Sequence, residues 1–155
     1  MIASLMVAAT VVIHLIGLGL LVALMRGHHR RLRERPAWAS QLIIIFAAAF
    51  GLFALHTVEI WAYAWLFVEV GALHSFDEAL YFSTTTYSTV GYGDIVLPPD
   101  WRLVGAIEGA NGIILLGWST AFFVSVVNRI RLFEQEVAEG PATSGSVQPN
   151  PPHVP

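Results

Sequence analysis

The sequence predicts an all-α membrane protein with three transmembrane helices, and with a short re-entrant helix and a non-helical loop between the second and third. The 155-residue chain is 55% hydrophobic and only 12% charged, with a mean hydropathy of +0.64. Soluble domains carry about a quarter charged residues. Three apolar stretches reach the roughly 20 residues that a membrane-spanning helix needs. A polar segment rich in hydroxyl groups and glycine separates the last two stretches.

The first apolar stretch, residues 1–25, predicts a transmembrane helix rather than a signal peptide. No basic residue precedes it, and it is longer than the apolar core of a signal peptide. It contains no arginine and has His14 near its middle. We expect this histidine to form a hydrogen bond to a neighbouring helix.

Residues 26–39 form a loop that is rich in arginine. By the positive-inside rule this loop is cytoplasmic, so the N-terminus lies outside and the C-terminus inside an expected plasma (inner) membrane. Arg129 and Arg131, which follow the third apolar stretch, agree with this orientation. The loop contains Arg26, Arg30, Arg31, Arg33 and Arg35.

The second stretch starts near Ser40 and stays mostly apolar to about Leu73. His56 and Glu59 stand three residues apart, so they share one helix face, which we expect near the outer end of the helix. An acid inside a membrane is by default a candidate functional residue. The pair is therefore a candidate modulatory site that senses protons. The alternative is a structural hydrogen bond to the first helix or to the short helix.

The segment after Ser75 predicts a short helix over residues 76–87. Ser75 followed three residues later by Glu78 is a capping-box pattern that marks a helix start. Twelve residues span about 18 Å, which is too short to cross a membrane. The backbone must then return to the outer surface, and non-helical backbone at that depth occurs only where protein buries it or where it lines a water-filled cavity.

The returning segment, Thr89 to Gly93, has the chemistry to hold a bare cation. Carbonyl oxygens can replace the water of the ion if successive carbonyls point the same way, which requires alternating right- and left-handed backbone. Gly91 and Gly93 suit the left-handed positions because glycine adopts positive φ at no steric cost. Thr89 can add its hydroxyl as the innermost oxygen, and the short helix directs its C-terminal carbonyls, the negative end of the helix dipole, at the cavity below, where the dipole favours a cation.

The third stretch, residues 103–127, predicts the last membrane-spanning helix. Glu108 lies one turn before Gly112 and needs a partner, such as Asn111 or a hydroxyl on the short helix of a neighbouring chain. Gly112 permits either a bend or close helix packing. Residues 132–155 are expected to be a largely disordered cytoplasmic tail, since they are rich in Pro, Gly and Ser.

The segment "TYSTVGYGD", Thr86 to Asp94, resembles the selectivity filter of potassium channels, and its "TVGYGD" core matches without a mismatch. The resemblance covers Leu42 to Arg131 and implies a pore domain over residues 40–131, with an outer helix, a re-entrant pore helix, a filter loop and an inner helix. It implies potassium sites at the carbonyls of Thr89, Val90, Gly91 and Tyr92, and a filter that ends at Gly93 and Asp94.

The resemblance also assigns supporting residues. It implies that Thr86 supports the filter, that Tyr81 reaches Asp94 from behind it, and that Tyr92 points away from the pore and packs on pore-helix aromatics. Gly112 matches the hinge of the inner helix, and close packing is an equal alternative. The candidate cavity wall below it contains Ile113, Leu116, Thr120 and Val124.

The function implied is a potassium-selective channel with a pore formed by a homotetramer in the lipid bilayer. Potassium is the permeant ligand, and no cofactor, nucleic acid or soluble regulatory domain is expected. The sequence shows no nucleophile–base arrangement and no metal cluster, so we expect no enzyme. A weakly selective cation channel and a non-conducting accessory subunit stay as alternatives. The first helix departs from the two-helix pattern, and without arginine it is not a voltage sensor of that family's type.

Overall fold

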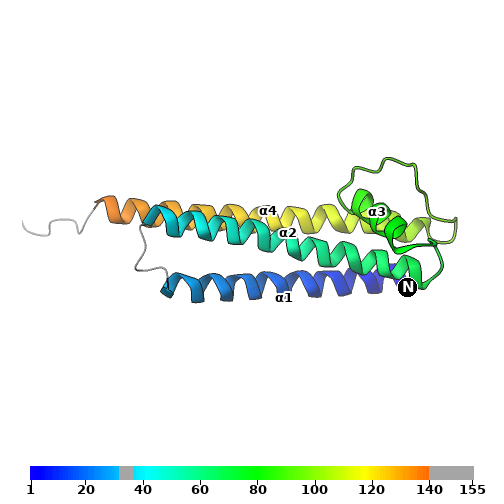
Figure 1. Cartoon of the computed structure of the whole chain (residues 1–155), viewed down its shortest axis with the longest axis horizontal. Coiled ribbons are helices and arrows are strands. Elements are labelled where there is room, and N and C mark those ends of the chain that lie inside the picture. The colour runs from blue at the N-terminus through cyan, green and yellow to red at the C-terminus, as the bar shows by residue number, and fades with distance from the viewer. Residues whose placement is uncertain (32–36, 140–155) are drawn as a thin grey trace, which may run out of the picture.

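A computed structural model describes residues 1–31 and 37–139 of the chain, and in these ranges every regular element is a helix. The elements are α1 (Ile2–Arg31), α2 (Ala37–Glu69), α3 (Phe76–Tyr87) and α4 (Arg102–Glu139) (Figure 1). The three long helices contain apolar spans long enough to cross a membrane, over Ile2–Gly27, Trp38–Glu69 and Arg102–Arg129. The predicted all-α membrane fold is confirmed.

The long helices extend beyond the predicted spans. The first helix continues past residue 25 through Arg26 to Arg31, and α4 continues past Arg131 to Glu139. Residues 32–36 and 140–155, which include part of the predicted arginine-rich loop and most of the predicted tail, lie outside the described residues. The N-terminus of α1 lies at the same end of the molecule as α3 and its loops, opposite the C-terminal end of α4 (Figure 1).

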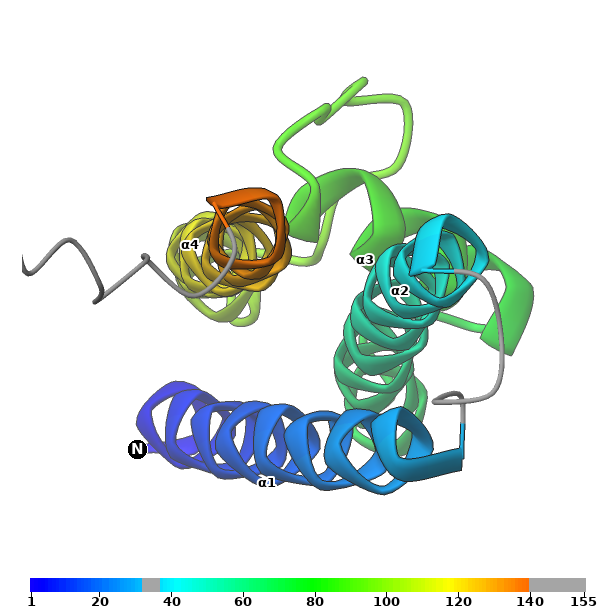
Figure 2. The ribbon, with the colours of Figure 1, turned by 90° about the vertical axis from the view of Figure 1, so that its left-hand side faces the viewer.

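Helix α1 is an integral part of the bundle. It contacts both α2 and α4 and lies on the side of these two helices that α3 does not occupy (Figure 2). Its contact with α2 is reciprocal: Leu55 of α2 lies against Gly17, and Leu21 of α1 lies against Gly51, so closely that a Cβ on either glycine would overlap the leucine. Small residues at helix crossings permit this approach in membranes. The remaining α1 faces expose apolar side chains, including Leu5, Leu15, Ile16, Leu20 and Leu24.

Helix α3 has the predicted bounds and the predicted N-cap. The Ser75 hydroxyl accepts a hydrogen bond from the Glu78 backbone N–H at 3.2 Å. The Glu78 carboxylate does not accept from the backbone N–H of Ser75, as a full capping box requires. It accepts instead from the backbone N–H of His74 at 3.4 Å. At its other end the helix stops at Tyr87, and the backbone N–H of the C-cap Ser88 donates to the Thr84 carbonyl at 3.2 Å.

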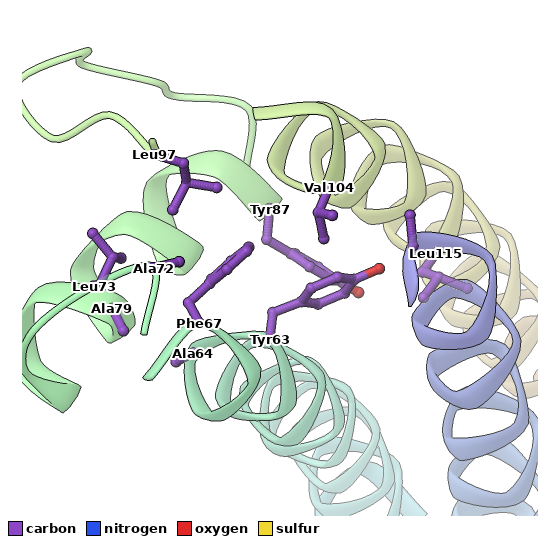
Figure 3. Packing of buried hydrophobic residues seen from close by; sticks show 11 residues of the cluster. Tyr63, Ala64, Phe67, Ala72, Leu73, Ala79, Tyr87, Leu97, Val104 and Leu115 are labelled. Carbon is purple, nitrogen blue, oxygen red and sulfur yellow. The ribbon is translucent and has the colours of Figure 1, made fainter. Parts of the chain in front are cut away.

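A hydrophobic cluster fixes α3 between α2 and α4 (Figure 3). Tyr63 and Phe67 of α2 lie beside Tyr87, and all three side chains are at most 1% exposed. Phe67 also meets Phe82 of α3 edge to face, with ring centroids 5.5 Å apart. Burial of these aromatic rings holds the short helix at a defined depth and angle. The cluster also contains Ala3, Ala64, Ala72, Leu73, Ala79, Leu97, Val104 and Leu115.

Candidate functional site

The loop after α3 alternates the handedness of its backbone. Thr89, Gly91 and Gly93 have φ of 62°, 52° and 78°, whereas Val90 and Tyr92 between them have negative φ. Such alternation turns successive carbonyls toward one side, which an ordinary strand does not do. The positive φ of the two glycines agrees with the sequence prediction. The sequence does not predict the positive φ of Thr89, because residues other than glycine rarely adopt positive φ.

Two backbone hydrogen bonds attach the inner half of this loop to the end of α3. The Thr89 N–H donates to the Thr86 carbonyl at 3.0 Å, and the Gly91 N–H donates to the Thr85 carbonyl at 3.0 Å. Thr86 therefore supports the loop through its backbone carbonyl. These bonds fix the position of Thr89 and Gly91 relative to a helix that is itself packed in the core.

The outer end of the loop is attached to α3 by a side-chain contact. The Tyr81 hydroxyl donates to Asp94 Oδ2 at 2.8 Å, and the backbone N–H of Ile95 donates to Asp94 Oδ1 at 3.1 Å. Tyr81 thus reaches Asp94 as the sequence implied. The loop is supported at both ends by the same short helix.

The contact between Tyr81 and Asp94 predicts a pH dependence. The hydrogen bond to Asp94 raises the pKa of Tyr81 above its ordinary value of 10.0. Because the donor is the protonated phenol, the contact is complete below pH 10 and is lost as the pH rises through the raised pKa. We expect the phenolate absorbance difference between wild type and Tyr81→Phe to titrate above pH 10. Asp94→Asn should move this titration back toward 10, and a midpoint at or below 10 in wild type would contradict the contact.

Within a single chain, no other part of the protein covers the side chains of Val90 and Tyr92 in this loop. Val90 is 53% exposed and Tyr92 is 72% exposed, and no atom lies within 4 Å of a Cβ built on Gly91 or Gly93. Within a single chain Tyr92 therefore does not have the aromatic cover expected for it. On α4, Ile113, Thr120 and Val124 of the predicted cavity wall are exposed, whereas Leu116 is partly buried against the core.

Glycines on α4 allow that helix to contact the end of α3 directly. A Cβ on Gly112 would overlap the backbone carbonyl and Cα of Tyr87, and a Cβ on Gly109 would lie 3.3 Å from the Thr86 carbonyl oxygen. The contacted atoms belong to the backbone and cannot rotate away. This close approach favours the packing role of Gly112 over the hinge role.

A polar cluster lies behind the C-terminal end of α3. Glu59 is fully buried and accepts from three donors: His14 Nδ1 at 2.8 Å, His56 Nδ1 at 2.9 Å and the Tyr87 hydroxyl. Ser119 Oγ of α4 lies 2.8 Å from His56 Nε2 and 3.5 Å from His14 Nε2. We call His14, His56, Glu59, Tyr87 and Ser119 the histidine–carboxylate cluster.

This cluster corrects the expected position of the modulatory pair. Glu59 stands ten residues before the end of α2, about 15 Å along the helix. The pair therefore does not lie near the outer end of the helix, but is sealed behind the base of the loop, with His56 only 12% exposed. His14 forms the interhelical hydrogen bond that was expected of it, although the sequence did not reveal that its partner would be Glu59. The structural hydrogen bonds of the pair to the first helix and to the short helix, which were the stated alternative, are thus present through His14 and Tyr87.

Two further buried polar groups belong to α4. Asn111 donates to Thr10 Oγ1 of α1 at 2.8 Å and to the Tyr63 hydroxyl at 3.4 Å, so it is not the partner of Glu108. The Glu108 carboxyl and the Ser83 hydroxyl of α3 are both fully buried and interact with each other, but neither forms a hydrogen bond of standard geometry among the described residues. Asn111 thus connects α1 to the helix that follows the loop.

Comparison with protein families gives one match. The model of a family described as "Ion channel" matches residues 40–129, more than half of the chain. No curated protein and no solved structure matches the chain significantly. The match covers α2, α3, the loop and the membrane-spanning part of α4, and leaves out α1. The chain therefore belongs to the two-helix pore-domain ion channel family.

Proposed function

We propose that the chain is the subunit of a potassium-selective channel. The observation that carries this proposal is the alternating backbone of Thr89 to Gly93, with positive φ at every second residue. It supports a column of carbonyl oxygens on one side of the loop, at Thr89, Val90, Gly91 and Tyr92. Such oxygens replace the hydration shell of a permeant potassium ion.

Four copies of the chain enclose the pore in this proposal. One chain provides one wall, and a potassium ion in such a filter is surrounded by carbonyls from four loops. Closed cyclic symmetry gives that ring from a single kind of chain. The exposed side chains of Val90 and Tyr92 support the same arrangement, because they lack cover in one chain and would gain it from a neighbour. The lipid bilayer surrounds the exposed apolar faces of the long helices.

The proposed channel has its filter mouth and its N-terminus outside the cell and its C-terminus in the cytoplasm. The five arginines over residues 26–35, at the end of α1 and just before α2, support this orientation by the positive-inside rule. The acidic residues of the filter end, such as Asp94 and Asp100, then face the outside and raise the local cation concentration.

The test is a reversal potential in bilayers that hold the purified protein. With potassium on one side and sodium on the other, we expect the current to reverse close to the potassium equilibrium potential. A reversal potential near zero would instead identify a weakly selective cation channel, because both ions would then pass. Absence of current from a protein that is folded and membrane-inserted would favour an accessory subunit. A functional monomer or dimer in nanodiscs would contradict the four-fold pore.

A further inference from the structure

The histidine–carboxylate cluster connects all four helices at one point inside the bundle. His14 comes from α1, His56 and Glu59 from α2, Tyr87 from α3 and Ser119 from α4. The ligand atoms of His14, His56 and Glu59 all lie within 4.8 Å of one another. We propose that the cluster binds one first-row divalent transition metal ion, such as Zn²⁺. The ligands are the two Nδ1 atoms and the Glu59 carboxylate, with the Tyr87 hydroxyl oxygen as the fourth ligand.

The ligand types and distances fit such an ion. Imidazole nitrogen and carboxylate oxygen bind Zn²⁺ at about 2.0–2.2 Å, and a tetrahedral arrangement at that distance separates the ligand atoms by about 3.3 Å. In the structure His14 Nδ1 lies 2.8 Å from Glu59 Oε1, His56 Nδ1 lies 2.9 Å from Glu59 Oε2, and His56 Nδ1 lies 3.1 Å from the Tyr87 oxygen. Each of these three pairs needs to open by about half an ångström or less to admit the ion, and the closer contact between the Tyr87 hydroxyl and Glu59 Oε2 needs to open further.

Ser119 Oγ lies where it can form hydrogen bonds to the Nε2 atoms of both imidazoles while their Nδ1 atoms bind the ion. With neutral rings that donate Nδ1–H to Glu59, both Nε2 atoms present lone pairs to Ser119 Oγ, which has a single hydrogen to give. With a metal ion on both Nδ1 atoms, both Nε2 atoms carry hydrogen, and the two lone pairs of the Ser119 oxygen can accept them. Metal-bound histidines usually donate their other N–H in this way.

A bound ion would connect α1 directly to the base of the loop. Tyr87 is the last residue of α3 and stands two residues before Thr89. An ion shared by His14, Glu59 and Tyr87 would hold α1, α2 and α3 at a fixed separation. The metal site does not depend on ion selectivity, so the binding experiment below can fail or succeed independently of the proposed potassium channel.

The test uses the full chain in nanodiscs and Co²⁺ as the probe, because tetrahedral Co²⁺ absorbs visible light. We expect one Co²⁺ per chain with a tetrahedral spectrum, displaced by Zn²⁺. His14→Asn keeps an N–H donor near the Nδ1 position but removes a ligand, so affinity should fall about tenfold or more. His74→Asn is the matched control, since His74 is exposed outside the cluster, and it should bind like wild type. The histidines at 28, 29 and 153 are kept in every protein.

Two results would overturn the proposal. The first is a wild-type protein that gives no tetrahedral Co²⁺ spectrum, as expected if the cluster is only a hydrogen-bond network. The second is equal Co²⁺ affinity in wild type and His14→Asn, which would place the binding at histidines outside the cluster. If His14→Asn does not fold, X-ray absorption of the Zn²⁺-loaded wild type decides the question. Two imidazoles with additional oxygen ligands are expected, and a shell with one imidazole or none would contradict the site.

Discussion

A channel with Gly91→Ala is expected to conduct no measurable potassium current. Gly91 has φ of 52°, and a residue with a Cβ in this region costs about 1–2 kcal/mol. The loop already carries one such residue, Thr89, at φ of 62°. A second, two residues away, favours relaxation of the backbone to negative φ, which turns a carbonyl away from its neighbours. In the proposed four-fold ring the cost occurs four times, so conduction should fail rather than weaken.

The matched control for this experiment is Gly71→Ala. Gly71 has φ of 68°, and like Gly91 it has no atom within 4 Å of an added Cβ, but it lies between α2 and α3. The backbone cost is the same in kind, so the two proteins should lose similar stability. Only Gly91→Ala should lose the potassium flux from liposomes. Wild-type conductance and selectivity in Gly91→Ala would show that the alternating backbone does not form the ion sites.

Gly112→Ala is expected to destabilise the folded protein strongly. The added Cβ would overlap the backbone of Tyr87, which has no side-chain rotamer to change. Overpacking of a well-packed core costs about 1–3 kcal/mol, and a contact with backbone belongs at the upper end of that range. We expect a low yield of monodisperse protein after detergent extraction, and a lower temperature of thermal unfolding for the fraction that folds.

Gly117→Ala separates this packing effect from general effects of alanine. Gly117 lies on the same helix, and no atom lies within 4 Å of its added Cβ. Alanine is preferred over glycine in a helix by about 1 kcal/mol, so Gly117→Ala should be at least as stable as wild type. If Gly112→Ala instead folds and assembles normally and changes only the open probability, the hinge role of Gly112 is supported and the packing role is wrong.

Short-range rules made much of the pore region predictable from the sequence. The bounds of α3 follow from the Ser75 cap and from the loop that begins after Tyr87, and the structure has the same bounds. The three spans follow from length and hydropathy. Positive φ at Gly91 and Gly93 follows from the freedom of glycine. Each of these features depends on one continuous stretch of sequence, so no knowledge of the helix arrangement was needed.

The partners of the buried polar residues were decided by the tertiary structure alone. His14 and Glu59 are 45 positions apart, and Asn111 and Thr10 are 101 positions apart. Which residues meet depends on the rotation and crossing of the helices. A soluble helix reveals its inner face by an apolar stripe, but lipid is as apolar as a protein core. Apart from a few polar residues the long helices are therefore apolar all round, and their sequence determines that they cross the membrane without determining which of those polar residues meet.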